Sequence, residues 1–329
     1  MSRADRIHQF LTTHGYAHAA MQPLAQDASF RRYWRLAGGP RRAVLMDAPP
    51  PEDVRPFLQV GSHLAEAGLS VPEVLAADAE AGLLLLEDFG DDLLAVLLSP
   101  ATEGALFDAA VDTLAAMQRP PAPNDLPVWD AGPMAATATA TLLDWWWPAA
   151  FGAPAPDAAR RDFAGALADM LRPLAAAAPV FVHRDFFAGN LIWLPDREGV
   201  RRIGMLDFQS AARGHPTYDL ASLIQDCRRD IPPAIAERAT ARFLAARPEL
   251  EPTAFRDGLA ICAAQRHLRV AGQWVRLARR DGRMHYLAYG PQTWRLLARA
   301  LRHPAAAPLA RAFDRWIPPE RRGPPALAA

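Results

Sequence analysis

The feature that most constrains the fold is the stretch over residues 181–209, which reads FVHRDFFAGNLIWLPDREGVRRIGMLDFQ. Short apolar runs at 180–182, 191–194 and 203–206 alternate here with polar residues. The segment PDREG between the second and third runs has the composition of a turn. The stretch therefore predicts a loop, a strand, a turn and a second strand, which ends at a carboxylate, Asp207.

Three oxygen-bearing side chains stand at the ends of these runs: Asp185, Asn190 and Asp207. Phosphoryl transfer to a hydroxyl needs one carboxylate that orients the acceptor and takes its proton, and oxygen ligands that hold magnesium on the nucleotide phosphates. Asp185 is the candidate base, and Asn190 and Asp207 are candidate ligands because Mg²⁺ prefers hard oxygens. His183 is expected to fix the loop by hydrogen bonding. A lone His-Arg-Asp or Asp-Phe-Gln is usually a turn or a helix cap, but the ordered set favours phosphoryl transfer with ATP and Mg²⁺.

The chain contains no lysine, since all 36 of its Lys and Arg positions are arginine. A Walker A loop needs Gly-Lys-Ser/Thr, so a P-loop enzyme is excluded. Schiff-base chemistry, including that of pyridoxal phosphate, is excluded for the same reason. The sequence also lacks Gly-x-Gly, Gly-x-Ser-x-Gly, Cys-x-x-Cys and His-Glu-x-x-His.

The length of 329 residues suits two lobes. The formal net charge of zero argues against nucleic acid as the main partner, and nothing points to an obligatory protein partner. No apolar run approaches the roughly 18 to 20 residues that cross a bilayer. The N-terminus has no apolar signal core, so we expect the cytoplasm. Cys227 and Cys262 lack metal-ligand spacing and are expected to be buried, reduced thiols.

Periodicity predicts a mostly helical chain after a strand-rich start. Two strands over 28–36 and 43–47 form a hairpin, and the leucine run at 83–86 is a buried strand. The tail from Pro304 is rich in Pro and Ala and is expected to fray. Trp145–147 favours a core or interface cluster, with sugar stacking as the alternative. Helices are expected over 3–14, 56–67, 91–98, 103–117, 134–147, 157–171, 233–247, 252–279 and 289–302, and after Pro216.

The pattern His-x-Asp-x-x-x-x-Asn at 183–190, followed by Asp-Phe-Gln at 207–209, resembles the catalytic and metal-binding loops of the kinase-like fold. The resemblance implies an α+β, two-lobed protein-kinase-like fold. Residues 1–90 would form a small lobe with an antiparallel sheet, and 91–329 a larger, mostly helical lobe. Only about ten residues separate Asp207 from the next helix, too few for a peptide-seating activation segment, so we expect a small-molecule acceptor.

In that fold the loop entering the first hairpin covers the nucleotide phosphates. Arginine guanidinium groups could grip phosphate oxygens there, although two arginines alternating across an exposed strand are the other interpretation. Met46 stands where kinases carry a phosphate-binding lysine. The segment 87–90 stands at the hinge, where backbone groups would meet adenine. The candidate nucleotide-binding residues are Ser29, Arg31, Arg32, Glu87 and Phe89.

The motifs are similar to those of the aminoglycoside and choline phosphotransferases, and closer still to the anomeric amino-sugar kinases of bacterial cell-wall recycling. The matching segments are 27–33, 44–50, 181–190, 206–209, 218–220 and 265–270. This subgroup also carries Met and Asp after the third strand, which makes Met46 compatible with activity. Residues 186–189 depart from the subgroup, which has Tyr after the Asp and Arg before the Asn. The resemblance implies ATP-dependent phosphorylation of the C1 hydroxyl of N-acetylmuramate or N-acetylglucosamine. The alternatives are a kinase for an aminoglycoside or another small alcohol, and a non-catalytic nucleotide-binding protein.

Asp219 falls in the first turn of the helix after Pro216, where it would support the catalytic loop or simply start the helix. Asp226 follows seven residues later, which places it on the same helical face and toward the acceptor. The guanidinium of Arg266 or Arg269 would bind the lactyl carboxylate of a bound muramate through paired hydrogen bonds, unless both residues belong to a solvent-exposed face. The full set of candidate substrate residues is Asp226, Gln265, Arg266, His267 and Arg269.

Overall fold

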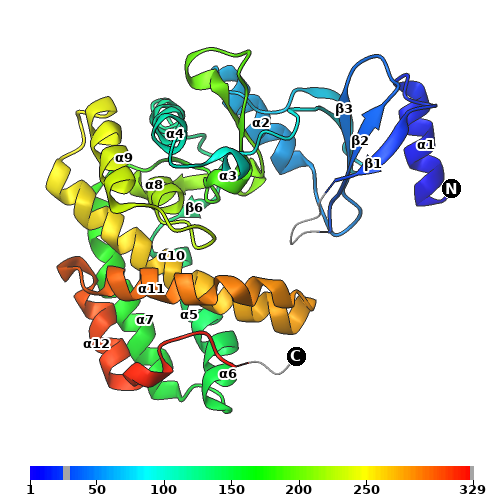
Figure 1. Ribbon diagram of the computed structural model, residues 1–329. Helices are drawn as coiled ribbons and strands as arrows, with labels where there is room; N and C mark the ends of the chain where they lie inside the picture. Colours follow the sequence, from blue (N-terminus) through cyan, green and yellow to red (C-terminus); the bar gives the residue numbers. More distant parts are fainter. Residues whose placement is uncertain (25–29, 327–329) are drawn as a thin grey trace. The chain divides into compact units, whose positions relative to one another are not determined.

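The computed structural model describes residues 1–24 and 30–326, in two compact units (Figure 1). The first unit contains residues 1–98 and 189–210, and the second contains residues 99–188 and the chain from 211 onward. The hairpin that carries Asn190 and Asp207 therefore packs with the N-terminal sheet.

An antiparallel sheet of five strands forms the first unit, in the order β1-β2-β3-β5-β4. Its central strands, β3 and β5, are apolar along nearly their whole length and buried on both faces, as a central strand requires. The expected hairpin and the buried leucine strand are confirmed, although residues 28 and 29 of the first expected strand lie outside the described residues. The strands β1 and β4 were not predicted. The strands are β1 (Ala20–Pro23), β2 (Arg32–Ala37), β3 (Ala43–Asp47), β4 (Val74–Asp78) and β5 (Leu83–Glu87).

The first unit contains the two helices expected over 3–14 and 56–67. Helix α1 (Arg3–Thr13) begins with a reciprocal capping box between Ser2 and Asp5. Helix α2 (Arg55–Glu66) buries one face, on which the Phe57 ring packs against the Phe208 ring with centroids 4.6 Å apart. Phe208 directly follows Asp207, so this contact anchors the segment that carries the carboxylate.

The predicted hairpin at 191–206 is confirmed as β8 (Leu191–Trp193) and β9 (Ile203–Met205). It is tied to the first unit by backbone hydrogen bonds: the Met205 N–H donates to the Ser70 carbonyl (2.9 Å) and the Trp193 N–H to the Asp92 carbonyl (2.8 Å). Asp92 lies just before the short helix α3 (Leu94–Leu97), which is all that forms of the helix expected over 91–98.

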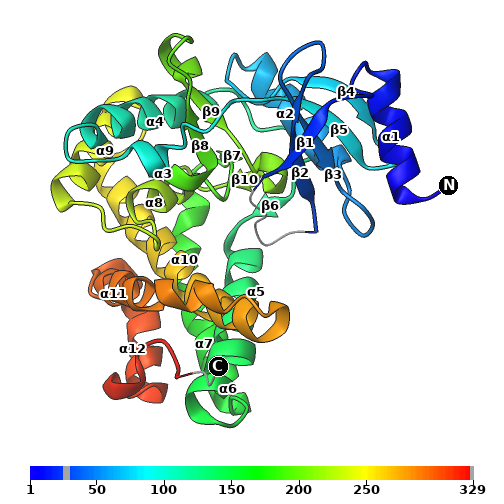
Figure 2. The same ribbon diagram turned by 45° about the vertical axis from the view of Figure 1, so that its right-hand side comes forward.

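The second unit combines a small sheet with most of the helices (Figure 2). In its sheet, β10 (Ala212–Gly214) lies between β6 (Val128–Trp129) and β7 (Val180–Val182). The long helix α10 contacts α5, α8 and α11. Gly272 is required at the crossing with α5, because a Cβ there would lie 2.1 Å from the Thr141 carbonyl oxygen. The helices are α4 (Glu103–Met117), α5 (Ala131–Thr141), α6 (Trp147–Phe151), α7 (Asp157–Leu171), α8 (Thr217–Ile224), α9 (Pro233–Ala246), α10 (Pro252–Asp281), α11 (Gly290–Leu301) and α12 (Ala307–Trp316).

Residues 304–316 form helical structure, so the expectation of a loose tail beginning at Pro304 is wrong for this part of the chain. Alanine is a strong helix former, and Leu309, Ala312 and Phe313 fall on one buried face of α12. The Phe313 ring packs edge-on against Phe163 of α7, with centroids 5.5 Å apart. Helix α12 is therefore part of the core of the second unit.

Two residues of the tryptophan cluster, Trp146 and Trp147, lie in the core, as predicted, whereas Trp145 is half-buried. The segment Leu142–Trp146 forms a single π-helical turn between α5 and α6. Trp146 is completely buried, packs at a tilt against Trp294 with ring centroids 4.9 Å apart, and donates its indole N–H to the Gly323 carbonyl (2.9 Å). Both cysteines are buried and unbridged, which confirms that prediction as well.

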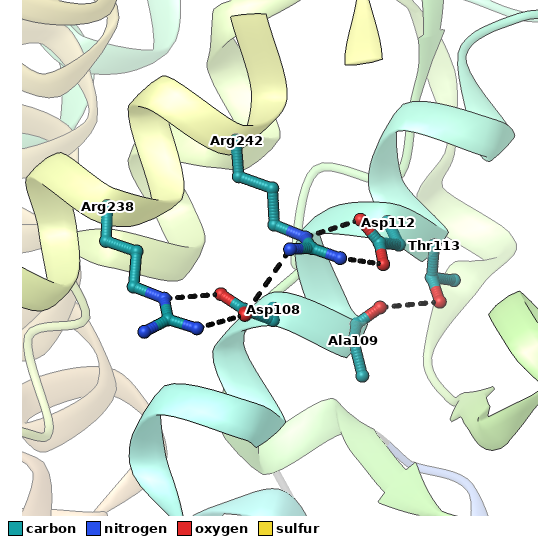
Figure 3. Close-up of polar contacts among 6 residues, drawn as sticks. All are labelled: Asp108, Ala109, Asp112, Thr113, Arg238 and Arg242. Carbon is teal, nitrogen blue, oxygen red and sulfur yellow. Dashed lines mark hydrogen bonds and ion pairs between the residues drawn. The ribbon is translucent and has the colours of Figure 1, made fainter. Parts of the chain in front are cut away.

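A ladder of ion pairs joins α4 to α9 (Figure 3). The Arg242 guanidinium donates two hydrogen bonds of 2.6 Å to Asp112, and Arg238 forms a similar fork with Asp108. Bidentate pairs in a network fix geometry better than isolated surface pairs do. Over the described residues, no helix has the length and apolar character needed to span a bilayer.

Candidate active site

The loop after β7 carries Asp185, and α8 holds this loop. The Asp219 carboxylate, in the first turn of α8, accepts hydrogen bonds from the backbone N–H groups of His183 (2.6 Å) and Arg184 (2.9 Å). The Asp185 N–H donates to His183 Nδ1 (3.3 Å). Arg184 has a left-handed backbone with φ of 74°, which costs roughly 1–3 kcal/mol outside glycine. The bonds to Asp219 offset that strain and hold Asp185 at the end of the loop.

The two carboxylates of this loop have opposite electrostatic environments. Burial raises the pKa of Asp219 to about 7, against the effect of the two backbone N–H bonds. Burial alone would also raise the pKa of Asp185, but the positive charges of Arg269 and Arg266 outweigh it, and the pKa is lowered. Asp185 is therefore ionised at neutral pH, which is the state that a proton acceptor requires.

Two aromatic residues follow Asp185 and anchor the loop from its other end. Phe186 is completely buried and packs edge-on against the His183 ring, with centroids 5.8 Å apart. The Arg228 guanidinium lies 4.2 Å from the centroid of the Phe187 ring, in a cation–π contact. The departure of this loop from the related sequences is thus accommodated by packing.

Asn190 and Asp207 lie at the same end of the β8–β9 hairpin. The Leu206 N–H donates to the Asn190 carbonyl (2.9 Å), which continues the ladder one step beyond the strands. Asp207 has a left-handed backbone with φ of 59°, and Gln209 Nε2 donates to its Oδ1 (2.6 Å). Non-glycine residues in this conformation are concentrated at functional sites. One carboxylate and one amide oxygen form a donor set that suits a hard cation such as Mg²⁺.

Of the candidate phosphate-binding residues, Ser29 lies outside the described residues. Arg31 forms an ion pair with Glu52, with Nη2 and Oε2 2.9 Å apart. Burial raises the pKa of Tyr33 to about 12, with the charge of Arg31 opposing this and that of Asp207 adding to it. The charges of Arg31 and Asp207 therefore both act on the Tyr33 hydroxyl.

Arg32 is engaged differently from Arg31. Its Nη2 lies 2.8 Å from Oδ2 of Asp47, which is its cross-strand partner on β3 and is completely buried. The Asp47 carboxylate also accepts a hydrogen bond from Arg3 Nε (2.8 Å), so α1 and β2 are linked through one acid. Met46 is fully buried inside the sheet.

At the hinge segment, both candidate side chains turn toward the β8–β9 hairpin. Glu87 pairs with Arg197, which lies in the hairpin turn, at 2.6 Å. The Phe89 ring lies against Gly204, where a Cβ would be 2.7 Å from it. These contacts hold the hinge segment on the hairpin that carries Asp207.

Two candidate substrate residues on α10 use their side chains inside the fold. Gln265 is completely buried and donates Nε2 to the Met134 carbonyl of α5 (2.8 Å). His267 is equally buried, with Nε2 3.0 Å from Gln225 Oε1. Burial and the charge of Arg266 hold the pKa of His267 well below its usual range, so the ring is neutral. Both side chains therefore make contacts inside the second unit, and their assignment to the substrate stays a prediction.

The helical placement of Asp226 is wrong. Helix α8 ends at Ile224, so Asp226 does not continue the face that carries Asp219. It is buried in the following turn, where it accepts a hydrogen bond from the Arg228 backbone N–H (3.0 Å). Its carboxylate organises this turn.

Arg266 and Arg269 lie one turn apart on α10. Arg266 is buried and donates Nη2 to Ser222 Oγ (2.6 Å), on the same helix as Asp219. Arg269 is half-buried. Both charges act on Asp185, so these two residues remain beside the candidate base.

The sequence pattern of the phosphotransferase enzyme family (APH) matches residues 20–255. The chain belongs to this phosphotransferase family. It is 37% identical to a Caulobacter vibrioides protein named N-acetylmuramate/N-acetylglucosamine kinase, over 95% of this chain and 96% of that protein. A protein of the same name from Pseudomonas aeruginosa is also 37% identical, over 88% of this chain and 87% of its own length. The expectation of a phosphotransferase is confirmed.

Solved phosphotransferase structures share the fold. A choline/ethanolamine kinase family protein from Mesorhizobium loti superposes with a TM-score of 0.65 at 16% identity, over 94% of this chain and 99% of that chain. The GDP complex of aminoglycoside 2'-phosphotransferase-IIIa gives 0.63 at 12% identity, over 91% and 99% of the two chains. The predicted protein-kinase-like, α+β fold is confirmed.

Three residues of this phosphotransferase were missed at the sequence level. Glu52 forms an ion pair with Arg31, and Asp47 binds both Arg3 and Arg32. Arg228 makes a cation–π contact with Phe187 of the catalytic loop. The pair formed by Glu52 and Arg31 spans a turn and a whole hairpin, so no local spacing indicates it. Asp47, the last residue of β3, lies in the matching segment 44–50, but the sequence did not indicate its two arginine partners.

Proposed function

We propose that the protein is an ATP-dependent kinase that phosphorylates the C1 hydroxyl of N-acetylmuramate or N-acetylglucosamine, in the recycling of the cell wall. The names and the coverage of the relatives support this acceptor class. The observation that carries the proposal is the loop of Asp185, whose carboxylate is kept ionised by neighbouring arginines and whose backbone is held by Asp219.

Asp185 is the proposed base. It would accept the proton of the sugar hydroxyl while the oxygen of that hydroxyl forms its bond to the terminal phosphorus, and ADP leaves with the electron pair of the broken bond. Positioning supplies much of the acceleration in such a reaction, so the restraint of the loop by His183 and Asp219 matters as much as the carboxylate itself.

The nucleotide would be held by residues of the first unit. Asn190 and Asp207 would hold Mg²⁺, which neutralises charge on the phosphates when bound. We assign phosphate binding chiefly to Arg31, because its pairing with Glu52 parallels the cation–glutamate pair that orders the phosphate site of kinases. Ser29 and Arg32 are secondary candidates, and the backbone of the segment from Glu87 to Phe89 would meet adenine.

An assay of ADP release tests the proposal, with ATP, Mg²⁺ and a panel of N-acetylmuramate, N-acetylglucosamine, an aminoglycoside and choline. We expect turnover with one or both amino sugars, and loss of at least roughly 1,000-fold in kcat for Asp185→Asn because its proton acceptor is removed. The matched control is Asp230→Asn, whose side chain is 82% exposed. Turnover with the aminoglycoside or choline alone would overturn the proposed acceptor. Wild-type rates for Asp185→Asn would overturn the proposed base.

A further inference from the structure

One face of α10 carries a stripe of arginines that begins beside the catalytic loop. Arg266, Arg269 and Arg276 are three and seven residues apart in turn, and at 100° per residue they fall within one quadrant of the helix. With a rise of about 1.5 Å per residue, the stripe extends roughly 15 Å along the helix axis.

Geometry ties the start of this stripe to the catalytic loop. The hydrogen bond from Arg266 Nη2 to Ser222 Oγ (2.6 Å) fastens α10 to α8. Ser222 lies one turn after Asp219, whose carboxylate holds the backbone of the loop. Arg269 is one turn further along α10 on the same face, and Arg276 two turns beyond that.

The stripe is poorly neutralised. Arg266 is 3% exposed, Arg269 and Arg276 are half-buried, and within the described residues the Nε of each is buried without a hydrogen-bond acceptor. None of the three forms an ion pair within residues 1–24 and 30–326. A partly buried guanidinium without an anion is costly, and a row of them repels itself.

The position of Arg276 separates two explanations of the stripe: that it binds an anion, or that it only lowers the pKa of Asp185. Arg269 and Arg266 act on Asp185, so their presence could be explained by that carboxylate alone. Arg276 is affected by Arg280, Asp281 and Arg269, and Asp281 is itself bonded to Arg280 (2.7 Å). Among the described residues, the acid that acts on Arg276 is thus Asp281, and its carboxylate is already engaged by Arg280.

We propose that Arg269 and Arg276 bind a carboxylate on the acceptor, so that the enzyme selects an anionic amino sugar over a neutral one. The inference rests on the proposed function, and it assigns the discrimination between the two sugars to named residues. N-acetylmuramate carries a lactyl carboxylate that N-acetylglucosamine lacks, and planar guanidinium groups bind carboxylates through paired hydrogen bonds. Arg266 is the less suitable fork, because it is almost fully buried and already bonded to Ser222.

The test compares kcat/KM for three acceptors: N-acetylmuramate, its neutral lactyl methyl ester and N-acetylglucosamine. We expect the wild type to favour N-acetylmuramate. Arg269→Gln should weaken the ionisation of Asp185 and so lower kcat/KM for all three acceptors. The loss for N-acetylmuramate should be roughly 10- to 100-fold greater than for the two neutral sugars, because a hydrogen bond to a charged group is lost only with the anion. Arg276→Gln should lower kcat/KM for N-acetylmuramate by about 3- to 10-fold.

Arg280→Gln is the matched control, since Arg280 is exposed on the same helix and bonded to Asp281. Arg269→Lys should retain part of the preference because it keeps the charge. If Arg269→Gln does not fold, Arg276→Gln and Arg269→Lys decide the question through the same ratio of the two sugars.

Two results would overturn the inference alone. One is a wild type that uses both sugars equally well. The other is an equal loss for all three acceptors in Arg269→Gln with the acid limb of the pH profile moved upward, which would mean that Arg269 acts only through the ionisation of Asp185. Absence of turnover with every amino sugar would instead overturn the proposed function, and the inference with it.

Discussion

Replacement of Asp219 by Asn tests how the catalytic loop is held. The carboxylate accepts two backbone N–H groups, from His183 and Arg184, one on each oxygen. An amide of the same size offers one acceptor and turns its NH₂ group toward the second backbone donor. One buried N–H is then unsatisfied, at a cost of about 1–3 kcal/mol. The loop that carries Asp185 should shift, so kcat should fall by more than the KM values change.

The effect on stability should depend on pH. Burial raises the pKa of Asp219 from 3.8 to about 7, so the folded protein favours the protonated acid. The stability that this group contributes is fully present below pH 3.8 and is lost as the pH rises through about 7. At about 1.36 kcal/mol per pKa unit, the loss approaches ~4 kcal/mol by pH 8, of which roughly 2.5 kcal/mol falls between pH 5 and pH 8.

Urea unfolding of the wild type and of Asp219→Asn at pH 5, 6.5 and 8 measures this difference. The amide does not titrate, so the variant should be clearly less stable than the wild type at pH 5. The difference in free energy of unfolding between the two proteins should be about 2.5 kcal/mol smaller at pH 8 than at pH 5. Asp230→Asn, with its exposed side chain, should show no such trend. A gap that stays constant across the three pH values would mean that Asp219 is ionised in the folded protein throughout, and would refute this argument.

Three further changes separate binding from stability. Asp207→Ala should abolish Mg²⁺-dependent binding of ATP in calorimetry, and unchanged binding would remove Asp207 from the metal site. Arg31→Gln should raise the KM for ATP by roughly 10-fold or more through a lost charge-assisted bond, with little change in the KM for the sugar; the reverse pattern would contradict the assignment. Phe313→Ala should destabilise the protein by about 3–5 kcal/mol because it empties the contact with Phe163, while kcat per folded molecule stays unchanged. A loss below about 1 kcal/mol would mean that α12 is not part of the core.

Local pattern predicted the parts of the site that depend on neighbours in the sequence. The β8–β9 hairpin follows from two apolar runs and the turn between them, and strand pairing then brings Asn190 and Asp207 to the same end. The position of Asp219 in the first turn of α8 was visible for the same reason. These features need only a few residues of context, which a sequence supplies.

Features that depend on tertiary contacts were not visible. The heptad spacing of Asp219 and Asp226 suggested one helical face, but α8 ends at Ile224, and Gln225 is bonded to His267 of α10 instead. The polar residues Gln265 and His267 looked available to a ligand, yet both are bonded inside the second unit. The spacing of residues shows which of them share a face of a helix. Which other elements pack against that face is seen only in the structure.

The C-terminal segment shows the opposite error. Its prolines and alanines suggested a frayed tail, although Leu309, Ala312 and Phe313 already had the spacing of a buried helical face. Spacing therefore predicts this helix better than composition does. The partner of that face, α7, lies far away in the sequence and could not be identified from it.

The most direct test of the proposed reaction is phosphorus NMR of the protein with ATP, Mg²⁺ and N-acetylmuramate or N-acetylglucosamine. We predict a new phosphomonoester signal coupled to the anomeric proton of the sugar, and no such signal with Asp185→Asn. Phosphate on a different hydroxyl, or ADP formed without any sugar phosphate, would contradict it.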